Sequence, residues 1–443
     1  MEDDEAMEHE KIMRWIDCNT DTAISFLQQI VQIPSVTGNE GPIQEFMKKY
    51  LEEMGLVVDC FVPDKEELKK HPAYVHTDIS YEGRPNLVAT AKGSGGGRSL
   101  LFNGHIDVIP EGAAENWGHG CWSGAIEDGK LYGRGTSDMK SGVAAMTMAL
   151  KAIRDSGVKL KGDVLLEYVM DEELTGNGTL ACVMRGYKAD AGICCETSSM
   201  RVQPGSIGRI WFTILVKGKA AGIQRRYEGV NAIDLGYIVT KAVSDFEAER
   251  VGKITHPLYP DILGSIPCMV GIFESGSYNS AFPDNCILKG SLATVPGENS
   301  AQVKQEFIAY IQENTAKQHS WLKDNPPQVV FTGYFAEPSS IPVDSPIVEA
   351  LSACYREVLG QPPVISGREG AADIRFLNQY GDTPTVIFGP GMTEQMHANN
   401  EWVYVKDYLD SIKVLAKTIM DWCGVMPKYT PGGIHQSLLG DVL

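Results

Sequence analysis

Positive charge is scarce in this sequence. Its 443 residues include 39 Lys and Arg against 57 Asp and Glu, which gives a formal net charge of −18 and an isoelectric point near 5.0. A protein of this sign repels the phosphates of nucleic acids and the anionic headgroups of membranes. We therefore expect neither nucleic acid nor a membrane among its partners.

Targeting and membrane-spanning segments are also missing. The sequence has no run of about 18 apolar residues to cross a bilayer, and its acidic opening, MEDDEAMEHE, lacks the basic patch and apolar stretch of a secretory signal. The ten cysteines show no repeated CxxC spacing, which argues against a zinc ribbon or a disulfide framework. These absences predict a cytoplasmic protein with reduced thiols.

The composition that is present is that of a folded globular protein. Hydrophobic residues make up 43% of the chain and charged residues 22%, unlike the composition of disordered chains. A chain of 443 residues exceeds one ordinary compact domain, so we expect at least two packed units.

The first 200 residues alternate between helical and strand patterns. Apolar residues recur at helical spacing in 22–33 and 41–54, and the apolar run SLLFNGHIDV (99–108) is typical of a buried strand. A helical segment, SGVAAMTMALKAIRD, and two strand-like segments, DVLLEYVM and DAGICC, follow. Strands interleaved with helices predict an α/β fold with a doubly wound, mostly parallel sheet.

The pattern changes near Gly208. RIWFTILVKGK alternates like a half-exposed strand, and a helix, two strands, a second helix and the strand QVVFTG follow. This order is typical of a small α+β, ferredoxin-like domain. The sequence therefore predicts a discontinuous catalytic domain, 1–206 and 333–443, with an inserted lid or dimerisation domain at 207–332.

Histidine and carboxylate residues cluster at the predicted strand ends. His105 and Asp107 lie two apart, so they share a face of the strand, where Asp107 can orient the His105 ring. Asp138, in GRGTSDMKSG, follows a glycine turn at the head of a helix. The alternative to a functional role is a hydrogen-bonded structural histidine for His105 and a helix N-cap carboxylate for Asp138.

Three adjacent carboxylates follow the strand DVLLEYVM. Burying Asp171, Glu172 and Glu173 beside a core strand is costly unless a cation neutralises them; the alternative is a solvated acidic loop. Glu196 follows the apolar strand DAGICC, and His397 lies in a Gly- and Pro-rich loop. Ligands of open α/β sheets bind at this edge of the strands, so we expect these side chains to meet.

With these motifs the sequence resembles the co-catalytic metallohydrolases that include aminoacylases, acetylornithine deacetylase, succinyl-diaminopimelate desuccinylase and glutamate carboxypeptidases. The matching motifs are GHIDV, YGRGTSDMKSG, MDEE, the Glu after an apolar strand, GVNAI and the final loop histidine. The resemblance covers nearly the whole chain, including the inserted domain.

The resemblance implies a role for each of these residues. It makes Asp138 a bridge between two ions, Asp107 the clamp on His105, and Glu172 the base that takes a proton from water and hands it to the leaving nitrogen. Oxygen and imidazole ligands without thiolates suit one or two zinc, manganese or cobalt ions. The implied metal ligands are His105, Asp138, Glu173, Glu196 and His397.

The sequence departs from the family pattern in the inserted domain. Relatives carry GKAAH or GKASH, with a histidine that helps to bind the substrate carbonyl, often from the partner subunit; this chain reads GKAAG, with Gly222 at that position. The family's further arginine is also missing from GSLATVPGE. Arg225 and Arg226 are candidates to supply charge instead, or are solvated loop arginines. Gly370 is a further candidate substrate-binding residue.

These observations predict a metal-dependent hydrolase of a C–N bond in a small, carboxylate-bearing substrate, of the N-acyl-amino-acid deacylase or dipeptidase type. One alternative is the family's divergent aminohydrolase branch, which releases ammonia from an aromatic amino acid such as 5-nitroanthranilate; attack on a ring carbon makes no carbonyl oxyanion, so the missing histidine fits it. Another is a non-catalytic metal-binding protein. By resemblance we expect a homodimer.

Overall fold

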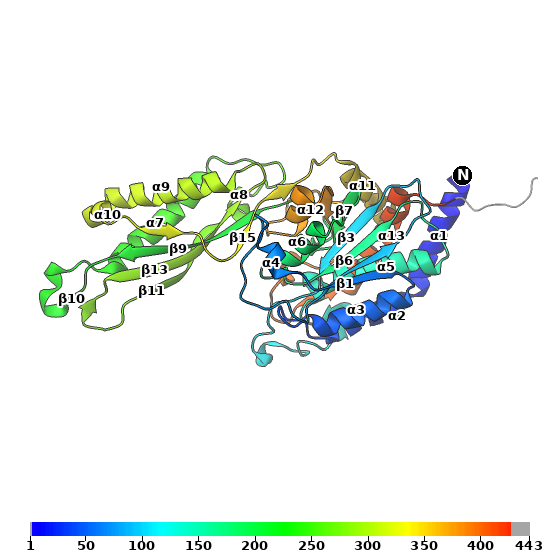
Figure 1. Cartoon of the computed structure of the whole chain (residues 1–443), viewed down its shortest axis with the longest axis horizontal. Coiled ribbons are helices and arrows are strands. Elements are labelled where there is room, and N and C mark those ends of the chain that lie inside the picture. Colours follow the sequence, from blue (N-terminus) through cyan, green and yellow to red (C-terminus); the bar gives the residue numbers. More distant parts are fainter. Residues whose placement is uncertain (1, 427–443) are drawn as a thin grey trace, which may run out of the picture.

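A six-stranded, mostly parallel sheet organises one part of this computed structural model, which describes residues 2–426 (Figure 1). The strand order is β1-β2-β6-β3-β7-β17, and β3 runs parallel to both β6 and β7. The sheet confirms the predicted α/β class. Its strands are β1 (Val57–Phe61), β2 (Asn86–Ala91), β3 (Leu100–His105), β6 (Val164–Val169), β7 (Ala191–Cys194) and β17 (Thr385–Ile387).

Helices cover both faces of this sheet. On β3, Leu100 and Phe102 pack toward α5 and α13, whereas Leu101 packs with Leu377 of α12 on the opposite face. A strand buried on both faces reads as a continuous apolar run, as the sequence predicted. The helices are α1 (Glu2–Cys18), α2 (Thr20–Gln32), α3 (Gly41–Glu53), α4 (Lys65–Leu68), α5 (Ser141–Asp155), α6 (Asn177–Met184), α11 (Pro346–Leu359), α12 (Ile374–Tyr380) and α13 (Val405–Cys423).

A five-stranded antiparallel sheet forms the second part, in the order β11-β13-β9-β14 with β15 also paired to β9. Ile210, Phe212 and Ile214 of β9 alternate toward the helices α7 and α9, which cover one face. The chain order β-α-β-β-α-β confirms the predicted ferredoxin-like pattern. The elements are β9 (Gly208–Lys217), α7 (Ala232–Val251), α8 (Ile262–Ser265), β11 (Cys268–Ser275), β13 (Asn285–Thr294), α9 (Ser300–Gln318), α10 (Ser320–Asp324), β14 (Gln328–Val330) and β15 (Phe335–Ala336).

Short elements complete the chain. β18 pairs with β5, which pairs with β4; β16 pairs with β8, and β10 with β12. Their bounds are β4 (Ile126–Glu127), β5 (Lys130–Tyr132), β8 (Gly205–Ser206), β10 (Ala221–Gly222), β12 (Ala281–Phe282), β16 (Ser339–Ser340) and β18 (Trp402–Tyr404), with helical turns η1 (Ala114–Asn116), η2 (Thr136–Lys140), η3 (Ile223–Glu228) and η4 (Thr393–Gln395).

The acidic opening is part of α1, which begins at Glu2, because Glu, Ala and Met favour helix and acidic side chains suit a helix N-terminus. The division at 206/207 and 332/333 stays a prediction; β15 still pairs with β9 at Ala336. In the described part of the chain, no helix has the length and apolar character that crossing a membrane requires.

A buried ion cluster holds the loop that follows β6. Arg84 donates to both carboxylate oxygens of Glu40 at 2.6 Å and to Asp171 Oδ1 at 2.9 Å. The side chains of Glu40 and Asp171 are fully buried, and that of Arg84 is 3% exposed. Asp171 has a positive φ of 68° and immediately precedes Glu172, so the cluster fixes where the next two carboxylates begin.

We expect the substitution Arg84→Gln to lower the free energy of unfolding by about 3–5 kcal/mol, because it leaves two buried carboxylates without their cation. Urea unfolding followed by circular dichroism measures the change. The matched control is Arg185→Gln, which removes a partly exposed pair with Asp59 and should cost less than about 1 kcal/mol. Equal losses for the two variants would contradict the role assigned to Arg84.

Candidate metal centre

The carboxyl ends of three neighbouring strands bring the predicted ligands together. His105 is the last residue of β3, Glu172 and Glu173 follow β6, and Glu196 follows β7. Because β3 lies parallel to and between β6 and β7, these residues reach the same edge of the sheet. This is the edge at which open α/β sheets bind their ligands.

Asp138 enters the site from the helical turn η2, which precedes α5. The Glu401 carboxylate accepts the backbone N–H groups of Gly135, Ser137 and Asp138, at 2.8–3.1 Å, and pairs with Arg134 at 2.8 Å. The N-cap of α5 is Lys140, so Asp138 is not a helix cap. Glu401 was not predicted, although it lies only four residues after His397.

The side-chain nitrogen and oxygen atoms of the cluster lie close enough together to bind the same metal ions. His105 Nε2 is 3.1 Å from Asp138 Oδ1 and 3.4 Å from Glu196 Oε1. On the other side, His397 Nε2 is 2.9 Å from Glu173 Oε2 and 3.5 Å from Asp138 Oδ2. The two oxygens of Asp138 therefore face two different histidines, as a bridging carboxylate would.

The electrostatics of the cluster fit a bound cation. Burial raises the pKa values of Glu172 and Glu173 above the usual range of a carboxyl group. Burial also opposes ionisation of Asp138, but the hydrogen bond and charge of His105 outweigh it and lower the pKa of Asp138. The His105 and Asp138 side chains are 1% and 5% exposed, so a divalent ion would offset a real desolvation cost.

Asp107 contacts both the histidine and the acidic loop. His105 Nδ1 lies 2.8 Å from the Asp107 backbone carbonyl oxygen, whereas the nearer carboxylate oxygen is 3.6 Å away. The carboxylate instead accepts the backbone N–H groups of Glu172 and Glu173, at 3.1 and 3.2 Å. The predicted contact with His105 is therefore made through the main chain, and the carboxylate orients two further site residues.

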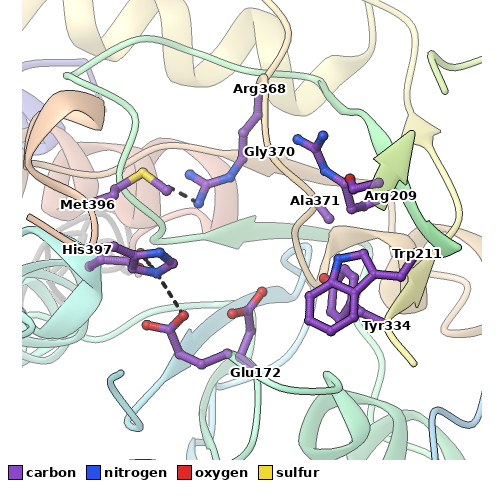
Figure 2. Close-up of a pocket in the computed structure, with 12 residues that line it drawn as sticks. Glu172, Arg209, Trp211, Tyr334, Arg368, Gly370, Ala371, Met396 and His397 are labelled. Atoms are coloured by element: carbon purple, nitrogen blue, oxygen red, sulfur yellow. Dashed lines mark hydrogen bonds and ion pairs between the residues drawn. The ribbon is translucent and has the colours of Figure 1, made fainter. Parts of the chain in front are cut away.

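A pocket of about 300 Å³ opens over the cluster and reaches the five-stranded sheet. Figure 2 shows Arg209, Trp211 and Tyr334 on the side of the pocket opposite His397. The predicted substrate-binding residue Gly370 lies in its wall, beside Arg368. Arg368 is buried, and its guanidinium donates to Glu196 Oε2 at 3.2 Å.

The predicted substrate contacts of the inserted segment do not lie in this pocket. Gly222 belongs to β10, at the end of the five-stranded sheet that points away from the six-stranded sheet (Figure 1). Arg225 and Arg226 are exposed in the following turn, where Arg225 pairs with Glu228 at 2.7 Å. Within one chain they are therefore separate from the metal cluster, and their predicted role stays a prediction.

Comparison with known proteins assigns the chain to a family. Residues 101–421 match the profile of Peptidase family M20/M25/M40. The chain belongs to this family. It is therefore a hydrolase that acts on C–N bonds, which confirms the predicted resemblance and enzyme class.

Similar proteins include enzymes with different substrates. The chain is 29% identical to an N-formyl-4-amino-5-aminomethyl-2-methylpyrimidine deformylase of Bacillus subtilis, over 88% of this chain and 91% of that protein. A dipeptidase of Saccharomyces cerevisiae has a TM-score of 0.72 at 16% identity, covering 94% and 98% of the two chains. A dinuclear metal-binding peptidase of B. subtilis has a TM-score of 0.63 at 14% identity, covering 92% and 99%. The two structures share the fold.

We expect Asp107→Asn to weaken metal binding by about 10- to 100-fold, as loss of an outer group that orients ligands does. The asparagine can accept only one of the two loop N–H groups. Competition with a chromogenic chelator measures the affinity. Asp190→Asn is the control, because Asp190 also accepts a backbone N–H, from Ser99, but far from the site. A similar loss of metal affinity in Asp190→Asn would contradict the role assigned to Asp107.

Proposed function

We propose that this protein hydrolyses the amide bond of a small N-acyl amine or N-acyl-amino acid, with Glu172 as the proton-transferring group. The observation that carries the proposal is the position of Glu172. Its carboxylate lines the pocket beside the metal cluster, 3.9 Å from His105 Nε2. Both the deformylase and the dipeptidase that resemble the chain have names that denote cleavage of an amide bond.

The five predicted ligands would hold two divalent ions, with Asp138 facing both. Support comes from the two histidines on opposite oxygens of Asp138 and from the family relative that binds two metals. Zinc, manganese and cobalt all suit these oxygen and imidazole ligands. When bound, such ions lower the pKa of water and polarise the acyl oxygen.

Glu172 has the surroundings of a group that accepts and returns a proton. Burial raises its pKa well above the ordinary value, and a carboxyl group with a raised pKa can serve as base and then as acid near neutral pH. In the reaction, its carboxylate takes a proton from the attacking water. It then delivers this proton to the departing nitrogen as the C–N bond breaks.

We expect Glu172→Gln to lower kcat by about 10²- to 10⁴-fold, since the amide cannot accept the proton. The measurement is turnover of N-formyl and N-acetyl amines, N-acyl-amino acids and dipeptides by the metal-loaded protein.

The neighbouring residue provides the matched control for this variant. Glu173→Gln should reduce bound metal, whereas Glu172→Gln should retain it; elemental analysis after gel filtration measures both. Because the Glu172 carboxylate also lies within coordination reach of His105 and Glu196, the comparison is decisive. Loss of metal from Glu172→Gln to the same extent would make Glu172 a ligand and reject its role as base.

A second candidate reaction, deamination of a small aromatic amino acid, is favoured by one observation. Gly222 carries no side chain where family members place the carbonyl-binding histidine, and water attack on a ring carbon forms no carbonyl oxyanion. The products separate the reactions. We expect a free carboxylic acid and an amine in equal amounts, by liquid chromatography; release of ammonia with formation of a phenol would instead support the aminohydrolase.

A homodimer is part of the proposal. Arg225 and Arg226 are exposed at the end of the five-stranded sheet that lies far from this chain's own pocket (Figure 1). If they contact substrate, they do so in the site of a second copy. The proposed cellular location is the cytoplasm, on the grounds given by the sequence.

A further inference from the structure

The pocket contains an arginine, Arg209, whose guanidinium is unpaired within the part of the chain that the structure describes. Arg209 lines the pocket with Asp138 and His397, and no described residue forms an ion pair or a side-chain hydrogen bond with its guanidinium. Burial lowers the pKa of Arg209. The phenol of Tyr334 lies close enough to oppose this effect through its charge. Arg368, across the pocket, is different because it already pairs with Glu196.

The backbone explains why Arg209 faces the pocket. Side chains of a strand alternate between its two faces, and on β9 Ile210 and Phe212 point into the core beneath the helices. Arg209 and Trp211 therefore share the opposite face, toward the metal cluster. Hydrogen-bonded pairing of Arg209 with Ala293 of β13 and Ala336 of β15 fixes its position in the sheet.

Two aromatic rings continue the same wall. The ring centroids of Trp211 and Tyr334 lie 6.0 Å apart, with planes at 48°. The backbone N–H of Trp211 donates a hydrogen bond to the backbone carbonyl oxygen of Tyr334 at 3.1 Å. The Trp211 side chain is 50% exposed, which leaves ring surface open to a ligand. The small residues Gly370 and Ala371 also line the pocket, and Figure 2 shows them between Arg368 and the two rings.

A ligand that satisfies this wall has two properties. A carboxylate offers Arg209 the charge-assisted, bidentate hydrogen bonds that its planar group favours, and it removes the cost of a desolvated, unpaired cation. A planar ring gains contact with the indole through stacking. Because Arg209 and Trp211 are two residues apart on one strand face and line the same pocket, a compact group that joins a carboxylate to a planar ring can contact both.

We propose that Arg209, Trp211 and Tyr334 form a recognition wall for an aromatic carboxylate, and that the substrate is an N-acyl derivative of an aromatic amino carboxylic acid. Which bond is cleaved rests on the proposed function, whereas the wall itself does not. The volume of about 300 Å³ suits a ligand of this size.

A second pocket adjoins the first at Trp211 and Ser291. It has a volume of about 450 Å³. Gly271 and Gly290 contribute no side chains to it, and Met269 supplies apolar surface. The second pocket therefore offers apolar surface next to Trp211.

Binding of non-hydrolysable probes tests the wall separately from turnover. The probes are benzoate, its neutral near-isostere acetophenone, and acetate, which lacks the ring; calorimetry on the metal-loaded full chain gives each Kd. Wild-type protein should bind benzoate at least about tenfold tighter than acetophenone, the gain expected of a hydrogen-bonded charge pair. Arg209→Gln should abolish this difference, and Trp211→Leu should remove the preference for benzoate over acetate.

Arg201→Gln is the matched control, because Arg201 is exposed and does not line the pocket; it should leave all three affinities unchanged. A carboxylate can also bind the metal ions, so the titrations are repeated on metal-free protein, where the Arg209 effect should persist. The proposal is overturned if Arg209→Gln leaves the benzoate-to-acetophenone ratio unchanged or if benzoate binding depends on metal alone. Neither result affects the test of Glu172, because these probes contain no amide.

Discussion

The burial of several carboxylates at one edge of the six-stranded sheet is the constraint on which this structure depends. Glu172, Glu173, Asp138 and Glu196 lie close together, and their side chains are almost entirely buried, where repulsion and desolvation both oppose their charge. Arg368 pairs with Glu196 and balances part of this charge, and divalent ions suit the remainder. The fold must therefore hold these groups in place against their mutual repulsion.

Carboxylates outside the cluster supply much of that rigidity through backbone hydrogen bonds. Glu401 accepts N–H groups around Asp138, and Asp107 accepts those of Glu172 and Glu173. Each bond fixes the main chain at or beside a ligand, and so sets where the ligand's side chain begins. Arg84 extends the support one step further by neutralising Asp171. The carboxylates of the site thus form two groups: those of the metal cluster, and those that hold the backbone of the cluster in position.

Sequence patterns predicted the parts that follow from local order. His105 ends a strand, Glu173 and Glu196 each follow one, and parallel strands end at a common edge, so their meeting could be expected. Contacts without a local signal were missed: Glu401 reaches Asp138 across 263 residues of chain. Strand alternation places Arg209 on the exposed face of β9, but only the packing of the two sheets shows that this face meets the pocket.

The structure shows that Gly222, where the resemblance predicts a histidine, lies far from this chain's own pocket. Arg225 lies near Gly222 in the sequence, yet both belong to the far end of the sheet, whereas Arg209 lies at the end that meets the metal cluster (Figures 1 and 2). Because Arg209 and Trp211 belong to one paired strand, any rigid-body closure of that sheet moves both together relative to Glu172. Recognition of the substrate and alignment of its scissile bond are then set by the same motion.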